Sequence, residues 1–159
     1  MLGTFRNIAA LAILATVAGF VLTWVARLTE DDVARNRLAA ETRILRELAG
    51  VDVDAAGDGD LVLCDRGQVI VRGVGRGYGG QFRLAIAVGA DDQIQGVRVI
   101  DHQETPGFGD ILDTPSAWLQ SFRIGDVHAV TGATVTSESV MQAVERIAGR
   151  VDLKALCPS

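Results

Sequence analysis

A cluster of hydroxyl side chains lies at the start of a helical pattern near the C-terminus. Residues 131–134 read Thr-Gly-Ala-Thr, and Thr136 and Ser137 follow them after Val135. The two small residues in the middle let the backbone approach a bulky group closely. Because the N–H groups at a helix N-terminus attract phosphate, the stretch could seat a phosphorylated ligand. On their own, the same residues also fit the commoner arrangement of a capped helix after a tight turn.

The helix that would position these hydroxyls is predicted from Ser137 onward. Its apolar residues recur on one face of a 3.6-residue period, and they are Val140, Met141, Val144, Ile147 and Ala148. Thr136 or Ser137 is the expected N-cap, and Gly149 is the expected end of the helix.

A second polar motif follows a predicted strand at residues 96–100. It reads His-Gln-Glu-Thr-Pro-Gly-Phe-Gly-Asp at 102–110, and its proline and glycines predict a loop of the kind that often carries function. Glu104, Thr105 and His102 offer hydrogen bonds to a ligand, although a His beside a Glu is more often a structural pair. Two His residues and scattered carboxylates do not make a nucleophile–base–acid set, so a hydrolase site is not indicated.

These motifs belong to a longer series, which resembles the FMN-binding domain of the RnfG/NqrC family over most of the chain. Its elements occur in order: Gly-Tyr-Gly-Gly at 77–80, strands at 84–88 and 96–99, the loop at 102–109, Trp118-Leu119, and Thr-Gly-Ala-Thr at 131–134. The Gly-Tyr-Gly-Gly turn is closer to the RnfG branch than to the sodium-pumping NqrC branch.

The resemblance implies a covalently bound FMN whose phosphate is esterified to Thr134. Around this tether, Glu104 and Thr105 could hydrogen-bond the flavin ring edge or the ribityl hydroxyls, and Tyr78 could stack on the ring or simply anchor its turn. The expected cofactor-binding residues are Tyr78, His102, Glu104, Thr105, Gly107, Phe108, Thr131, Gly132, Ala133, Thr134, Val135, Thr136 and Ser137. No catalytic residue and no metal site is expected.

The chain departs from the family pattern at two positions. Phe108 replaces the usual Leu of the loop, a change that could still cover a flavin face. His128 replaces the Asp that usually stands three residues before the Thr-Gly-Ala-Thr motif, and the nearest acid is Asp126. If the flavin transferase reads that Asp, attachment would be less efficient or would use another contact.

The function implied by the resemblance is that of a flavoprotein subunit that relays electrons within an Rnf-type ion-translocating oxidoreductase, between ferredoxin and NAD. Such a subunit has no complete active site of its own. Its expected partners are the other membrane subunits and a flavin transferase. Two alternatives remain open: a free-standing flavinylated carrier or sensor domain, and a flavin-free accessory assembly subunit.

An uncharged segment at residues 7–26 is long enough to span a bilayer. A retained anchor is expected rather than a signal peptide, because no clear cleavage site follows it. Arg27, Arg35 and Arg37 follow the span, so charge counting does not support a cytoplasmic N-terminus. The periplasmic (extracytoplasmic) location of the C-terminal domain, on a single-pass protein of the inner (cytoplasmic) membrane, is therefore implied by the family alone.

The remaining pattern predicts an α+β protein with three parts: a membrane anchor helix at 1–27, an amphipathic stem helix at 28–50 and a small antiparallel-sheet FMN-binding domain with flanking helices at 51–159. Thr29 and Asp32 resemble a capping box that restarts the helix, and Gly50 is its expected end. The apolar face of the stem consists of Ala34, Leu38, Thr42, Leu45 and Ala49. Strands are predicted at 61–64, 69–71, 81–88 and 94–100, with a turn at Asp91-Asp92 between the last two. Trp118 and Phe122 are expected in the core.

Charge and cysteine content limit the remaining possibilities. The net charge of −5 over 159 residues provides no basic stripe, so nucleic acid is not an expected partner. Cys64 and Cys157 lack the C-x-x-C spacing of zinc or iron–sulfur sites. A disulfide between them in an oxidising compartment and two separate buried thiols remain equal alternatives.

Overall fold

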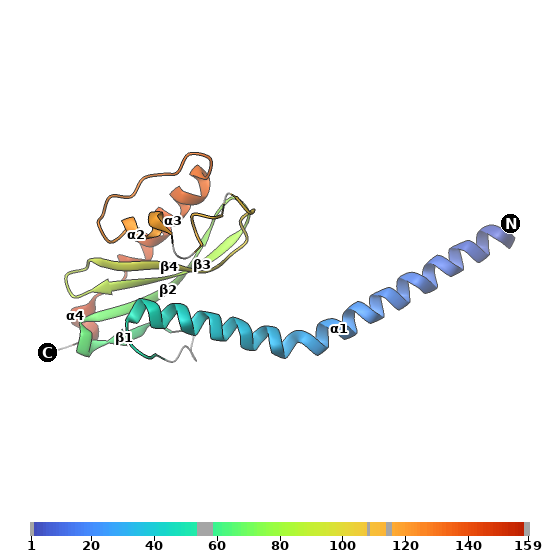
Figure 1. The fold of residues 1–159 in the computed structure, drawn as a ribbon, viewed down its shortest axis with the longest axis horizontal. Helices are drawn as coiled ribbons and strands as arrows, with labels where there is room; N and C mark the ends of the chain where they lie inside the picture. The colour runs from blue at the N-terminus through green and yellow to red at the C-terminus, as the bar shows by residue number, and fades with distance from the viewer. Residues whose placement is uncertain (1, 54–58, 108, 114–115, 158–159) are drawn as a thin grey trace. The chain divides into compact units, whose positions relative to one another are not determined.

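The computed structural model describes residues 2–53, 59–107, 109–113 and 116–157, with side chains from residue 6 onward (Figure 1). The chain divides into two compact units, residues 1–39 and residues 40–159. The first unit is entirely helical. The second contains the last turns of that helix, the sheet and the remaining helices, and it carries the motifs that could do chemistry.

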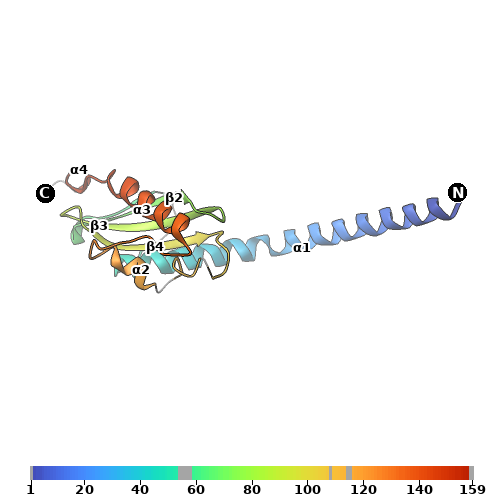
Figure 2. The same cartoon turned by 90° about the horizontal axis from the view of Figure 1, so that it is seen from above.

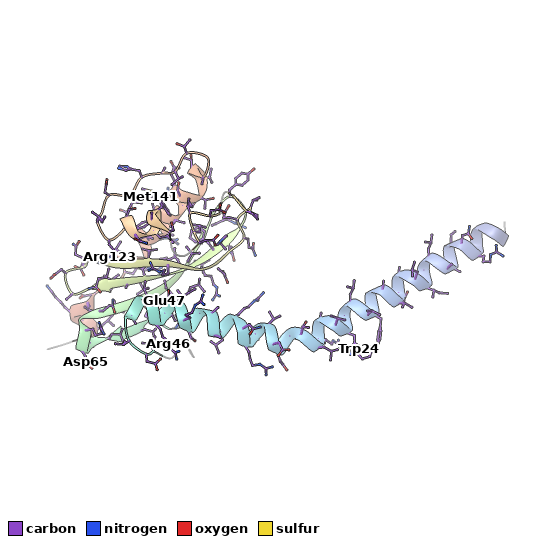
Figure 3. The ribbon with its side chains drawn as sticks, in the orientation of Figure 1. Trp24, Arg46, Glu47, Asp65, Arg123 and Met141 are labelled. Atoms are coloured by element: carbon purple, nitrogen blue, oxygen red, sulfur yellow. A yellow bond between two sulfur atoms is a disulfide. The ribbon has the colours of Figure 1, made fainter. Side chains whose placement is uncertain are left out.

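Helix α1 (Leu2–Ala49) contains one segment that is long and apolar enough to cross a membrane. Its large apolar side chains are exposed, Leu22 by 71% and Trp24, labelled in Figure 3, by 58%. The ring centroids of Phe20 and Trp24 lie 6.2 Å apart. The hydroxyls of Thr16 and Thr23 donate to carbonyls four residues earlier, both at 2.8 Å. All these features suit a lipid environment, where polar groups must be satisfied within the helix. The fold therefore fits a single-pass membrane protein.

The predicted restart of the helix at Thr29 is wrong, because α1 runs through this position without a break. Thr29 donates to the carbonyls of Val25 at 3.1 Å and Ala26 at 3.2 Å, as a hydroxyl inside a helix does. Asp32 pairs with Arg35 one turn later instead of reaching back to cap a new helix. No glycine or proline occurs between Ala26 and Ala49, and the helix ends where Gly50 adopts a φ of 66°, as predicted.

The sheet has four antiparallel strands in the order β1-β2-β3-β4, which confirms the α+β class. The strands are β1 (Leu61–Leu63), β2 (Gln68–Arg76), β3 (Gln81–Gly89) and β4 (Ile94–His102), and a 3-10 turn, η1 (Cys64–Arg66), follows β1. The β3–β4 connection is the predicted hairpin. Asp92 has a φ of 58° there and donates from its N–H to the Gly89 carbonyl at 3.0 Å.

Strand β2 extends five residues beyond its predicted end at Val71. Gly73 and Gly75 weaken the strand pattern in the sequence, but they are sites of close packing. A Cβ atom at Gly73 would lie 2.1 Å from Ile147 Cδ1, and one at Gly75 would lie 2.2 Å from Phe82 Cζ. The two glycines therefore make room for a helix and a ring on the sheet.

Both faces of the sheet are covered (Figures 1 and 2). On one face, Leu45 and Ala49 of α1 pack on Ile70, Ala85 and Ala87. The other face carries the main core beneath α2 (Ala117–Ser121), α3 (Thr134–Ala148) and α4 (Leu153–Leu156). The two core clusters take alternate residues of each strand, as the period of a strand requires. The predicted stem face is buried only in its last turns, since Leu38 is 49% exposed.

A cluster of charged side chains fastens the end of α1 to the sheet. The carboxylate of Glu41 lies 3.2 Å from Arg72 of β2 and 3.4 Å from Arg83 of β3, and Arg83 lies 2.8 Å from Asp101 of β4. The side chains of Glu41 and Arg72 are only 12% exposed. The hydrogen bond that Arg83 donates to Asp101, with support from Glu41, raises the pKa of Arg83 above its ordinary value. The helix is thus held to two strands by ion pairs as well as by apolar contact.

A disulfide joins Cys64 to Cys157, which resolves the alternatives that the sequence leaves open. It links the turn after β1 to the residue after α4, across 93 positions of sequence. In the chain-entropy account, closing a loop of this length stabilises the fold by up to about 4–5 kcal/mol.

Candidate functional site

The site is built around the first turn of α3, which begins at Thr134, three residues earlier than predicted. Its N-cap is Ala133, and no side chain caps it. The expected N-cap role of Thr136 or Ser137 is therefore wrong, because both hydroxyls lie inside the helix and serve other segments. Ser137 Oγ accepts from the Val130 N–H at 2.9 Å, and Thr136 Oγ1 accepts from the Tyr78 N–H at 3.4 Å.

The uncapped helix start exposes donors next to an exposed hydroxyl. Ser137 donates from its N–H to the Ala133 carbonyl at 2.9 Å, and the N–H groups of Val135 and Thr136 precede that bond. They belong to the first turn of the helix, whose N–H groups have no intrahelical partner. Thr134 is exposed, and its Oγ1 donates to the Val130 carbonyl at 3.3 Å. Thr134 is thus an accessible hydroxyl at the positive end of a helix.

An open hollow of about 430 Å³ lies beside this turn. Three segments that are distant in sequence meet there: the Gly-Tyr-Gly-Gly turn after β2, the loop that follows the end of β4, and the start of α3. The lining residues are Tyr78, Glu104, Gly132, Ala133, Thr134, Val135 and Thr136. The structure thus brings together seven of the residues predicted to form the site.

The other predicted site residues that the structure describes do not line this hollow. Thr131 is exposed and Ser137 is fully buried. His102 lines a different hollow with Arg43 and Arg98 of α1 and β4. Phe108 lies outside the described residues.

Thr105 and Gly107 shape the loop that follows β4. The carbonyl of Thr105 accepts from the Gly109 N–H at 3.0 Å, and the Gly107 N–H donates to Asp110 Oδ1 at 2.9 Å. Gly107 has a φ of 91°, which favours glycine. These contacts hold the loop in one conformation beside the hollow.

Glu104 is the buried polar group of the hollow, with only 9% of its surface exposed. Its Oε2 accepts from the Gly79 N–H at 3.0 Å, whereas Oε1 has no hydrogen-bond partner among the described residues. A Cβ atom at Gly77 would lie 2.0 Å from Oε1, so the carboxylate packs directly on the turn backbone. A buried acceptor oxygen without a partner is costly, and a bound donor would remove the cost.

The segment before Thr131 is anchored away from the hollow. Trp118 packs edge to face on Phe122, with ring centroids 5.3 Å apart, and Phe122 is buried, which confirms the predicted core role of this pair. The indole N–H of Trp118 donates to the His128 carbonyl at 2.8 Å. The imidazole of His128 is 84% exposed and lies 3.0 Å from Asp126. Its side chain is therefore accessible from solvent.

Comparison with known proteins shows what this domain is similar to. Residues 77–149 match the FMN-binding domain family, and this segment runs from the Gly-Tyr-Gly-Gly turn to the end of α3. The match contains every residue that lines the hollow. Residues 77–149 are therefore similar to an FMN-binding domain, on a chain whose described residues include one candidate membrane span, and the resemblance inferred from the motifs is confirmed.

The similar proteins share one description, the G subunit of an ion-translocating oxidoreductase complex. The chain is 36% identical over 90 residues to this protein from Pseudoalteromonas atlantica, a match that covers 45% of the chain and 42% of the relative. The corresponding proteins of Aliivibrio fischeri and Shewanella amazonensis are 34% and 36% identical over 88 residues, and 44% of the chain is covered in both cases. The match therefore spans less than half the length of these relatives.

Proposed function

We propose that this protein carries FMN covalently, through a phosphoester to Thr134, and relays electrons as a subunit of an Rnf-type ion-translocating oxidoreductase in a membrane. The observation that carries the proposal is the position of Thr134. Its exposed hydroxyl lies on the wall of the hollow and at the start of α3, where a phosphate would meet the free N–H groups of Val135 and Thr136.

The residues of the hollow fit FMN in size and chemistry. Its volume of about 430 Å³ lies within the range of small-molecule sites. Gly132 has a φ of 89° and no side chain, so the backbone beside Thr134 leaves space for the phosphate. Tyr78 and Val135 supply apolar surface for a ring, and Glu104 supplies an acceptor for the cofactor's hydroxyl or imide donors.

FMN, when bound, supplies the redox chemistry, and the chain supplies attachment, orientation and access. Thr134 is a tether and takes no part in turnover. Tyr78 is 82% exposed and Val135 is 55% exposed, so the wall of the hollow is open to a partner. An open site cannot hold its cofactor by burial, and this is the physical reason for a covalent bond at Thr134.

The proposed partners are the other membrane subunits of such a complex, which would couple ferredoxin and NAD, and a flavin transferase that loads Thr134. We place the sheet domain on the periplasmic side of the inner membrane. The Cys64–Cys157 disulfide supports this side, because disulfides persist in oxidising compartments.

Intact-mass measurement tests the tether. The full chain, produced with a flavin transferase, should gain the mass of one FMN less water. Thr134→Ala and Thr134→Val should gain nothing and still fold, since the Thr134 side chain is exposed and makes one 3.3 Å bond. Thr131→Ala is the matched control, because it removes the other threonine hydroxyl of the motif and should keep some flavin.

Two results would contradict the proposal. Covalent flavin on Thr134→Ala would move the tether to Thr131 or Thr136. A folded wild-type chain that takes no flavin would favour the accessory assembly role, and His128→Asp then tests whether the missing family Asp is the cause. Under the proposal, His128→Asp loads as well as the wild type or better.

A further inference from the structure

Within the proposed flavin site, one atom has a more specific role than the family match assigns. Glu104 Oε1 is buried in the wall of the hollow and has no partner among the described residues, while Oε2 is already bound by the Gly79 N–H. A carboxylate oxygen can only accept hydrogen bonds. The group that completes this site must therefore be an N–H or O–H of the ligand.

The position of Oε1 determines which end of the cofactor it meets. A Cβ atom at Gly77 would lie 2.0 Å from Glu104 Oε1 and 3.3 Å from Thr136 Oγ1, so both oxygens flank the same point of the backbone. Thr136 lies in the first turn of α3, two residues after Thr134. Oε1 is thus on the side of the hollow formed by the first turn of α3, the turn that would carry the phosphate, and the ribityl hydroxyls of FMN follow that phosphate.

The phosphate itself cannot be the partner, because its oxygens are acceptors and carry the same sign of charge as the carboxylate. We propose that Glu104 Oε1 accepts a hydrogen bond from a ribityl hydroxyl of the tethered FMN and so orients the chain between tether and ring. This rests on the proposed function, and it assigns Glu104 to the ribityl chain and not to the ring edge.

The neighbouring contacts fix Glu104 for this role. Its own N–H donates to His102 Nδ1 at 3.3 Å, and the other ring nitrogen of His102 lies 3.2 Å from Asp113 Oδ1. With Nδ1 as acceptor, the ring proton sits on Nε2 and is donated to Asp113. A Cβ atom at Gly109 would lie 2.9 Å from both Glu104 Cβ and His102 Cε1. His102 therefore holds the backbone of Glu104 by accepting a hydrogen bond from its N–H. In this role His102 is a positioning residue that does not touch the cofactor.

Binding of two flavins to the unloaded full chain in detergent tests the contact. The probes are FMN and ω-phosphopentyl flavin, which keeps ring and phosphate but lacks the ribityl hydroxyls, titrated to millimolar concentration by fluorescence anisotropy. The wild type should bind FMN about tenfold more tightly, as expected for a hydrogen bond to a charged group. Glu104→Ala should weaken FMN about tenfold and leave the analogue unchanged. Glu138→Ala, which removes an exposed acid of α3, should change neither affinity.

The outcomes separate the inference from the proposed function. Equal weakening of both flavins by Glu104→Ala overturns the ribityl contact and leaves the flavin site intact. Failure of the wild type to bind FMN overturns the hollow as the flavin seat, and the contact with it. As a second readout, covalently loaded Glu104→Gln should keep the wild-type absorption maxima, because the chromophore itself loses no hydrogen bond. A shift in the maxima would place Glu104 against the ring and overturn the inference.

Discussion

Replacing Glu41 by Ala should detach the end of α1 from the sheet more effectively than any other single charge change. Breaking a buried ion pair costs about 3–5 kcal/mol. Arg72 is only 12% exposed, but Arg83 is 43% exposed and keeps its bond to Asp101, so part of that cost is recovered in water. We expect Glu41→Ala to lower the free energy of unfolding of residues 40–159 by about 2 kcal/mol, which corresponds to roughly 6–10 °C in Tm.

Thermal unfolding of the full chain in detergent, followed by circular dichroism, measures this loss. Glu47→Ala is the matched control, because Glu47 stands on the same helix and makes one exposed pair with Arg43 at 3.9 Å (Figure 3). That change should cost less than about 0.5 kcal/mol. If the two variants lose the same stability, the ion cluster does not fasten the helix and the apolar contact of Leu45 and Ala49 alone holds it.

Other features give shorter predictions. Gly77→Ala should cost about 1–3 kcal/mol in denaturant unfolding and reduce flavin loading, because its Cβ would lie 2.0 Å from Glu104 Oε1. Gly59→Ala is the control and should be neutral, because a Cβ there has nothing within 4 Å. An equal loss of stability in the two variants would refute the close approach at Gly77. Cys64→Ser should lower the unfolding free energy by up to about 4–5 kcal/mol, and reductant should then have no further effect. The full chain should stay in membranes through a high-salt wash while residues 28–159 are soluble, and release by salt would exclude a spanning helix. A reporter after Ser159 should work only outside the cytoplasm, and activity of a cytoplasmic reporter would reverse the topology.

The sequence predicted the elements of the site better than their boundaries. Periodicity located α3 because Val140, Val144 and Ile147 recur on one buried face. It placed the N-cap wrongly, because Ser137 and Thr136 satisfy Val130 and Tyr78, and such long-range partners leave no local signal. The continuity of α1 was missed for a similar reason, since Thr29 and Asp32 match a capping box but bond within the helix.

Close packing accounts for the rest of what the sequence could not predict. Gly73 and Gly75 suggested the end of a strand, and only the positions of Ile147 and Phe82 explain them. His102, Glu104, Thr105, Gly107 and Phe108 were each expected to bind the cofactor. Of those that the structure describes, only Glu104 lines the hollow, and His102 instead accepts a hydrogen bond from the Glu104 N–H. Strand β4 ends at His102 and Glu104 lies in the loop beyond it, so strand alternation does not relate the two side chains.

Because the hollow is open, its lining residues need not retain a tethered cofactor by burying it. A ligand tethered by a short chain is present at an effective concentration in the millimolar range, whatever the level of free flavin in the surrounding solution. Contacts from Tyr78, Glu104 and the α3 N-terminus therefore need only millimolar affinity to keep the ring in place. With FMN tethered to Thr134 as proposed, that bond would secure occupancy, and selection on the lining residues could act on geometry and exposure.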